Sequence, residues 1–306
     1  MDKGVASRAP RASRGRRLLK RFALAASLGV LSLATGGALV ATSSALAGVT
    51  VGQLDPGGSP AGCGADFDFL QPTVTSGNSY VIPYPGTITS WATRANSTAG
   101  LQMTLKIFRA VSGLTYQVVG HAGPQTLQPS QVNSFPANLA VKPGDVLGVN
   151  VPTAGTACLF PVTNDTYLYR YGFPVPSGLG DGESGAFSQS SASSRVNVSA
   201  VLSPSNSFTL GAVTYNKKKG TATLTANVPN PGELTGSGNG VSAAAATISK
   251  TVSAPGDVQL LIKATGKKKK KLKQKGKVKL NVGVTYTPTG GDPSSQSITV
   301  KLKKKL

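Results

Sequence analysis

The chain has 306 residues, of which 39% are hydrophobic and 14% are charged, and its formal net charge is +21. This length suits about two domains. One His, two Cys and one Trp are too few for a multi-histidine metal centre, an iron–sulfur cluster or a disulfide-dense scaffold, so we expect no cofactor.

The positive charge is unevenly distributed along the chain. Residues 1–47 hold eight Lys or Arg against one acidic residue, whereas residues 48–203 hold six basic and seven acidic residues. Residues 204–306 hold 18 Lys against three acidic residues, a net charge of +15. The high isoelectric point therefore belongs to the two ends of the chain, and the middle is nearly neutral.

Residues 1–47 are typical of an export signal, because an arginine-rich segment precedes an uncharged stretch of small and apolar residues. Small residues at Ala45 and Ala47 suit signal peptidase, which places cleavage between Ala47 and Gly48. The adjacent Arg16 and Arg17 fit twin-arginine export, and the general secretory route fits equally well. We expect a secreted, extracellular or cell-surface protein with no transmembrane helix in the mature chain. The alternative is an uncleaved anchor, because the apolar run approaches the ~20 residues that span a bilayer.

Cys63 and Cys158 are the only cysteines in the chain. An even pair in an exported protein is more often a disulfide than two free thiols, so we predict one bridge between them. The alternative is a pair of buried, reduced cysteines.

Residues 48–203 alternate apolar and polar side chains with period two, as antiparallel strands do. In residues 101–107 the four apolar residues point one way and the polar residues the other, which predicts a half-buried strand. Roughly nine or ten such strands suit a jelly-roll-like β-sandwich. Residues 204–207 interrupt the pattern where the charge changes, so we assign them to a linker.

Residues 208–306 repeat the alternation in a shorter unit without cysteines. About seven strands in this length is the number found in an Ig-like sandwich. The sequence therefore predicts an all-β protein in four parts. These are a signal peptide at 1–47, a jelly-roll-like β-sandwich at 48–203, a linker at 204–207 and a Lys-rich Ig-like β-sandwich at 208–306.

A dense run of lysines is the strongest local signal in the C-terminal unit. Alternating strands flank it on both sides, so we expect it at the tip of a hairpin, where it would bind polyanions such as an anionic cell-wall polymer, lipid headgroups or acidic polysaccharide. Because aromatic residues are not interleaved with it, we expect no specific recognition of nucleic acid. The alternative is a solubilising hairpin whose lysines guard strand edges. The candidate residues are Lys267, Lys268, Lys269, Lys270, Lys271, Lys273 and Lys275.

Aromatic residues offer a second candidate surface, in the N-terminal unit. Tyr167, Tyr169 and Tyr171 share one face of a predicted strand. Trp91 lies on the face opposite Ile88, which predicts that its ring is displayed. Displayed rings stack against sugars, so the tyrosines and Trp91 form a candidate carbohydrate-binding face. The alternative is that they are core residues or cross-strand pairs.

Carboxylates and the single histidine are weaker candidates. Asp181 and Glu183 flank a glycine in a Gly-rich loop, but they lack the ligand density of an EF-hand, so we predict no metal site and keep them as weak candidates for Ca²⁺. Asp66 and Asp68, on one side of a predicted strand, have the same shortcoming. No Gly-x-Ser-x-Gly motif supplies a nucleophile for His121. We therefore predict no catalytic residues and no enzymatic activity; a secreted hydrolase with paired carboxylates is the alternative.

Two parts of the chain resemble known modules. Residues 216–234, which begin Asn-Lys-Lys-Lys-Gly and end Asn-Pro-Gly-Glu-Leu, resemble a Lys-rich Ig-like module at the C-termini of secreted bacterial proteins, as do the lysine run and residues 284–291 and 299–304. The N-terminal unit is similar to the β-sandwich that such modules often follow, in residues 86–91, 105–109, 116–120 and 142–148. The resemblance implies an extracellular or cell-envelope protein of undefined activity.

The charge distribution, the leader and the missing catalytic set favour a non-enzymatic exported protein with a binding or structural role. In this hypothesis the basic C-terminal module attaches to polyanions of the cell envelope. The second hypothesis is a carbohydrate-binding protein that uses the aromatic face, and the third is the secreted hydrolase.

Overall fold

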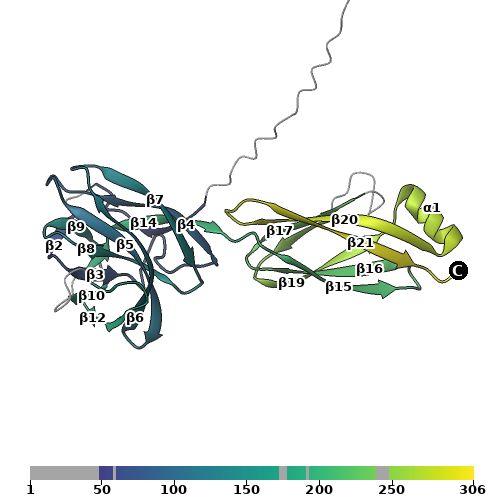
Figure 1. Ribbon diagram of the computed structural model, residues 1–306, viewed down its shortest axis with the longest axis horizontal. Helices are drawn as coiled ribbons and strands as arrows, with labels where there is room; N and C mark the ends of the chain where they lie inside the picture. The colour runs from purple at the N-terminus through teal and green to yellow at the C-terminus, as the bar shows by residue number, and fades with distance from the viewer. Residues whose placement is uncertain (1–47, 58–59, 172–177, 191–192, 239–247) are drawn as a thin grey trace, which may run out of the picture. The chain divides into compact units, whose positions relative to one another are not determined.

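The computed structural model describes residues 48–57, 60–171, 178–190, 193–238 and 248–306, which fold into antiparallel sheets and one helix (Figure 1). The predicted all-β sandwich fold is confirmed. The predicted export signal lies in residues 1–47, outside the described residues, so its cleavage stays a prediction. Within the described residues, no helix has the length and apolar character needed to cross a bilayer.

Residues 49–204 form three sheets, which we call the N-terminal sandwich. The four-stranded sheet has the order β1 (Val49–Gln53), β14 (Val198–Pro204), β4 (Gly86–Arg94) and β7 (Val132–Val141). The three-stranded sheet has the order β13 (Ser194–Val196), β9 (Thr156–Pro161) and β2 (Ala61–Cys63). The largest sheet has the order β11 (Ser184–Ala186), β6 (Thr115–Thr126), β5 (Gln102–Ser112), β8 (Val146–Val151), β3 (Phe67–Leu70), β10 (Leu168–Tyr171) and β12 (Ser188–Gln189).

Residues 209–303 form two further sheets, which we call the C-terminal sandwich. One sheet has the order β15 (Thr209–Asn216), β16 (Thr221–Val228) and β19 (Gly256–Lys263). The other has the order β18 (Ile248–Val252), β17 (Gly232–Ser237), β20 (Lys277–Pro288) and β21 (Ser294–Lys303). A separate apolar core joins the two sheets, with Leu224 and Leu260 from the first and Leu280 and Val300 from the second. The finer jelly-roll-like and Ig-like assignments stay predictions.

The largest sheet of the N-terminal sandwich is covered on both faces. The apolar residues of β5 enter the main core, as their alternation predicts. Thr104 and Lys106 on the opposite face are only 5% and 4% exposed, because Leu179 and Phe187 belong to a second core on that side. The expectation of a half-buried strand is therefore wrong, since a sequence pattern does not reveal which segment covers the polar face.

Trp91 is buried rather than displayed, which corrects its assignment to a ligand-binding face. It is 1% exposed in the main core, and its ring centroid lies 5.0 Å from that of Phe135. A β-bulge causes the difference, because the register of β4 with both neighbouring strands skips Thr89. The extra residue resets the alternation, so that Ile88 and Trp91 both point inward although three positions separate them.

The lysine run forms a helix, not the tip of a hairpin. α1 (Gly266–Lys275) connects β19 to β20, and these strands belong to different sheets, so the chain has to cross between sheets at this point. Lysine is a good helix former, and the run contains no β-branched residue. Leu272 is buried and fixes the helix on the sandwich. Gly276, with φ of 65°, ends the helix by donating its backbone N–H to the Leu272 carbonyl.

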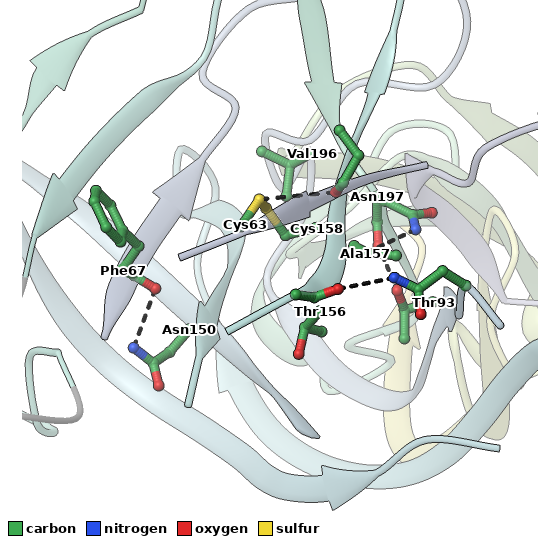
Figure 2. The surroundings of a disulfide bond; sticks show 12 residues. Cys63, Phe67, Thr93, Asn150, Thr156, Ala157, Cys158, Val196 and Asn197 are labelled. Atoms are coloured by element: carbon green, nitrogen blue, oxygen red, sulfur yellow. Dashed lines mark hydrogen bonds between the residues drawn. A yellow bond between two sulfur atoms is a disulfide. The ribbon is translucent and has the colours of Figure 1, made fainter. Parts of the chain in front are cut away.

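The predicted disulfide between Cys63 and Cys158 is confirmed, and it joins the neighbouring strands β2 and β9 with 5.9 Å between the Cα atoms (Figure 2). Asn197 is wholly buried beside it. The backbone N–H of Asn197 donates to the Cys158 carbonyl at 2.7 Å, and its side-chain amide donates to the Ala157 carbonyl at 3.0 Å. Thr93 Oγ1 donates to the Asn197 carbonyl at 2.7 Å, which connects the disulfide-bearing strand to β4.

Removal of the disulfide is expected to destabilise the N-terminal sandwich strongly. The bridge spans a sequence separation of 95 residues. By chain entropy, the Cys63→Ala/Cys158→Ala variant should lose about 4–5 kcal/mol of unfolding free energy. Urea unfolding followed by the fluorescence of Trp91, the only tryptophan, measures this loss. Equal midpoints for the variant and the native protein would contradict the prediction.

Candidate functional site

The lysines of the C-terminal sandwich gather at one end of it. β19 ends at Lys263 and β20 begins at Lys277, and α1 connects these two strand ends. The backbone N–H of Lys304 donates to the Gly276 carbonyl at 2.8 Å, and that of Lys305 donates to the Lys217 carbonyl at 2.9 Å. All but Lys250 of the 18 lysines in residues 204–306 therefore belong to this end. We call it the lysine pole: Lys217, Lys218, Lys219, Lys263, Lys267, Lys268, Lys269, Lys270, Lys271, Lys273, Lys275, Lys277, Lys279, Lys301, Lys303, Lys304 and Lys305.

The acidic residues of the C-terminal sandwich lie away from the lysine pole. Glu233 stands opposite Thr287, near the end of β20, and Asp257 stands opposite Asn227, near the end of β16. Asp292 lies in the connection between β20 and β21. Over the part of the chain that the structure describes, no salt bridge joins a lysine of the pole to an acid. The positive charge of the pole is therefore left for solvent ions or a bound anion.

Two lysine-lined clefts flank α1. The larger, of about 430 Å³, lies between the helix and the β20–β21 pair. We call it the ladder cleft; its lysines are Lys268, Lys271, Lys277, Lys279, Lys301 and Lys303. The smaller, of about 220 Å³, reaches the β15–β16 turn, and its lysines are Lys219, Lys263, Lys269, Lys273 and Lys304. Lys267 and Lys270 are exposed and line neither cleft.

The structure thus brings the predicted lysines of residues 267–275 together with lysines from four other places in the chain. The sequence analysis assigned binding only to the run itself. The Lys-x-Lys patterns at 277–279 and 301–303 could have indicated further binding lysines, because such patterns place both lysines on one face of a strand. Their pairing depends on the register of β20 and β21, which the sequence pattern alone does not give.

The three predicted tyrosines lie on one edge of the N-terminal sandwich, next to phenylalanines from β3. Tyr169 stands opposite Phe69 and Tyr171 opposite Phe67, in the antiparallel pair of β10 and β3. The ring centroids of Tyr167 and Tyr169 are 6.2 Å apart, and those of Phe67 and Tyr171 are 4.9 Å apart. The expected aromatic face therefore contains phenylalanines that the sequence analysis missed, and Trp91 is not part of it.

A groove of about 250 Å³ opens beside these rings, and we call it the aromatic groove. Phe67, Phe69, Tyr167 and Tyr169 line one side of it. The other lining residues are Gly62 and Cys63 of β2, Gly64 directly after it, and Leu159 of β9. Among the described residues, no charged side chain lines the groove, so a ligand there would be held by stacking and by hydrogen bonds to hydroxyls or backbone.

The weak metal candidates have separate partners. Asp181 Oδ1 lies 2.8 Å from His121 Nδ1, and both side chains are about half exposed. Glu183 Oε2 accepts the backbone N–H of Gly180 at 2.8 Å. Within the described residues, no group of three or more His, Cys, Asp or Glu side chains gathers to hold a metal ion.

Asp68 belongs to a buried ion pair and does not share a surface with Asp66. Its Oδ1 accepts the Lys106 ammonium at 2.7 Å, and its Oδ2 accepts the Leu179 backbone N–H at 2.8 Å. Lys106 also donates to the Leu179 carbonyl at 2.6 Å, and the Asn150 amide donates to Asp68 Oδ1 at 3.1 Å. These bonds hold the segment around Leu179 on the outer face of the large sheet. The pair therefore has a structural role, and its lysine lines a cavity of about 280 Å³ together with His121.

The comparisons with known proteins add no family assignment, since no family model matches the chain and no curated protein is similar to it. The lysine pole and the aromatic groove consequently stand as candidate sites on their geometry alone.

Breaking the Asp68–Lys106 pair is expected to destabilise the N-terminal sandwich. Lys106→Met leaves a buried carboxylate without its cation, which costs about 3–5 kcal/mol of unfolding free energy. Asp68→Asn/Lys106→Met removes both charges and should recover much of that loss. Urea unfolding followed by Trp91 fluorescence compares the two variants. A loss below about 1 kcal/mol in Lys106→Met would show that the pair does not hold this face together.

Proposed function

We propose that the protein is a non-enzymatic exported protein that attaches through its lysine pole to an anionic polymer of the cell envelope. The observation that carries this proposal is the segregation of charge in the C-terminal sandwich, with all lysines but Lys250 at one end. A device for solubility alone needs dispersed charge, whereas a positive patch attracts and orients a polyanion. The export signal predicted in residues 1–47 and the resemblance to secreted bacterial modules support a location outside the cytoplasm.

Attachment through the lysine pole is expected to weaken with salt. Protein that begins at Gly48 should bind isolated envelopes at 0.05 M salt and lose at least about tenfold in affinity by 0.5 M, because each neutralised anion releases a counterion. Sedimentation of the envelope with bound protein measures the affinity at each salt concentration. Binding that is equally strong at both salt concentrations would overturn the proposal.

A matched pair of variants separates the pole from net charge in the same assay. Lys269→Gln/Lys273→Gln removes two pole lysines and should weaken binding about threefold or more. Lys142→Gln/Lys250→Gln removes two exposed lysines outside the pole and should leave binding unchanged. Equal effects of the two variants would assign the binding to net charge rather than to the pole.

The aromatic groove favours a second candidate function, binding of a neutral carbohydrate by the N-terminal sandwich. The uncharged lining with Tyr167 and Tyr169 carries this candidate. Aromatic rings supply a flat apolar surface, and tyrosine hydroxyls add a polar edge. Because no charge lines the groove, this binding would persist at high salt, which distinguishes it from attachment through the lysine pole.

Removal of the tyrosine rings tests this candidate. Tyr167→Ala/Tyr169→Ala should lower retention on cellulose, chitin or starch by about tenfold, the equivalent of about 1.4 kcal/mol of lost stacking. The control Tyr215→Ala removes a ring that is 45% exposed on β15 and should bind as the native protein does. The fluorescence of buried Trp91 verifies that the N-terminal sandwich of the double variant is folded. Unaltered retention of the double variant would exclude the groove as a carbohydrate site.

A further inference from the structure

The ladder cleft has a floor of directly opposed lysines. In the antiparallel pair of β20 and β21, Lys277 stands opposite Lys303 and Lys279 opposite Lys301. All four side chains are exposed, because the alternate residues of both strands enter the core. The two lysine pairs therefore form consecutive rungs on one outer face of the sandwich.

This arrangement is unfavourable unless an anion occupies it. Like charges placed directly across an antiparallel pair destabilise it. The same two strands make a complementary pair one rung further on, where Thr299 Oγ1 donates to Asn281 Oδ1 at 3.0 Å. The repulsive rungs are thus confined to the part of the strands that lies beside α1.

α1 forms the wall of the cleft beside this floor. Lys268 and Lys271, three positions apart, lie on the same side of the helix and line the cleft. Lys268 Nζ donates to the backbone carbonyl of Lys279 at 3.5 Å, which places the helix against the rungs. Figure 1 shows α1 beside β20 at the end of the C-terminal sandwich. Ammonium groups therefore face the cleft from its floor, which the rungs form, and from its wall, which α1 forms.

The dimensions of the floor suit a chain with regularly spaced charges. Consecutive outward residues of a strand are about 6.8 Å apart, and the Cα atoms across a rung are about 4.5–5.5 Å apart. An anion on one rung therefore meets two ammonium groups, and the next anion along a linear polymer meets the following two. In the described part of the chain, the residues other than lysine that line the cleft are Val278 and Leu302, and neither offers an aromatic ring to stack on a base.

The lysines also favour phosphate over carboxylate. A phosphate group presents several charged oxygens that diverge, and lysine binds it as a compact point charge with three rotatable donors. Residues 204–306 contain no arginine, so neither anion can be held by a planar fork, and the preference rests on the larger number of charged oxygens that a phosphate presents to several ammonium groups. A ligand with one phosphate per repeat matches both the chemistry and the ladder.

We propose that the ladder cleft is the binding groove for a linear phosphate polymer of the envelope, with consecutive phosphates on consecutive lysine rungs. This inference rests on the proposed attachment through the lysine pole and narrows it to one groove and one chemical class of ligand. Recognition is of the charged backbone and its spacing, so repeats with different side groups are bound alike.

The experiment compares two charge-matched variants of the pole, using protein that begins at Gly48. Lys279→Gln/Lys301→Gln removes one rung, whereas Lys267→Gln/Lys270→Gln removes two exposed lysines of α1 that line neither cleft. At 0.15 M salt, where the Debye length is about 8 Å, loss of the rung should raise the Kd for inorganic polyphosphate at least about tenfold. The helix variant should raise it by no more than about threefold. Both Kd values are measured by titration calorimetry.

The stability of the rung variant gives an independent readout. Because Lys279→Gln/Lys301→Gln relieves a like-charge contact, its thermal midpoint without ligand should equal or exceed that of the native protein. Polyphosphate should raise the midpoint of the native protein more than that of the rung variant, since a ligand stabilises the folded state according to its affinity. The inference would be overturned if the thermal midpoint of the rung variant were lower than that of the native protein without ligand and rose by as much with polyphosphate.

Further outcomes separate this inference from the function on which it rests. Equal losses of affinity in the rung and helix variants would overturn the assignment of binding to the ladder cleft and leave attachment through the pole intact. Binding of polyglutamate as tight as that of polyphosphate would overturn the preference for phosphate. Poly(glycerol phosphate) and single-stranded DNA distinguish two sources of phosphates, and a preference for the DNA would overturn the assignment to an envelope polymer. If no polyanion binds in any salt, the proposed function itself fails.

Discussion

The burial of alternate apolar residues fixes the register of β20 and β21, and the lysine pole depends on that register. Val278 pairs with Leu302 and Leu280 with Val300, and all four enter the core between the two sheets. A slip of one residue in either strand would turn its apolar side chains to solvent and its lysines inward. The core therefore holds the lysines opposite one another against their mutual repulsion. A charged surface that gains nothing from its own packing is kept in place by hydrophobic burial directly beneath it.

Much of the fold follows from local alternation, and its departures have specific physical causes. The strands of both sandwiches and the Cys63–Cys158 bridge are predictable, because period-two patterning and cysteine pairing are local or countable signals. The buried position of Trp91 is not predictable, since a single bulged residue at Thr89 reverses the face on which every later side chain of β4 falls. The helical form of the lysine run is also not predictable from its flanks, because two alternating strands suggest a hairpin unless the sheets to which they belong are known.

The candidate sites show the same division between local and long-range information. The sequence singles out the lysines of residues 267–275 and the tyrosines of residues 167–171, but α1 turns its lysines toward two separate clefts and toward solvent. The sequence does not supply the partners of the tyrosines, because Phe67 and Phe69 stand about a hundred positions before the tyrosines and reach them only through the pairing of β3 with β10. Asp68 was a surface candidate in the sequence, yet it is buried with Lys106. The covering segment around Leu179 decides this, and it lies far along the chain.

The separation of lysines and acids in the C-terminal sandwich gives that module a large electric dipole moment along its strands. Near a negatively charged surface such a dipole experiences a torque as well as an attraction, so the module turns its lysine pole inward before any contact forms. Encounters from unsuitable directions are thereby converted into productive ones. The strands then stand end-on to the surface, and their length sets how far the acidic end projects from it. Charge placement thus determines an orientation and a height as well as an affinity.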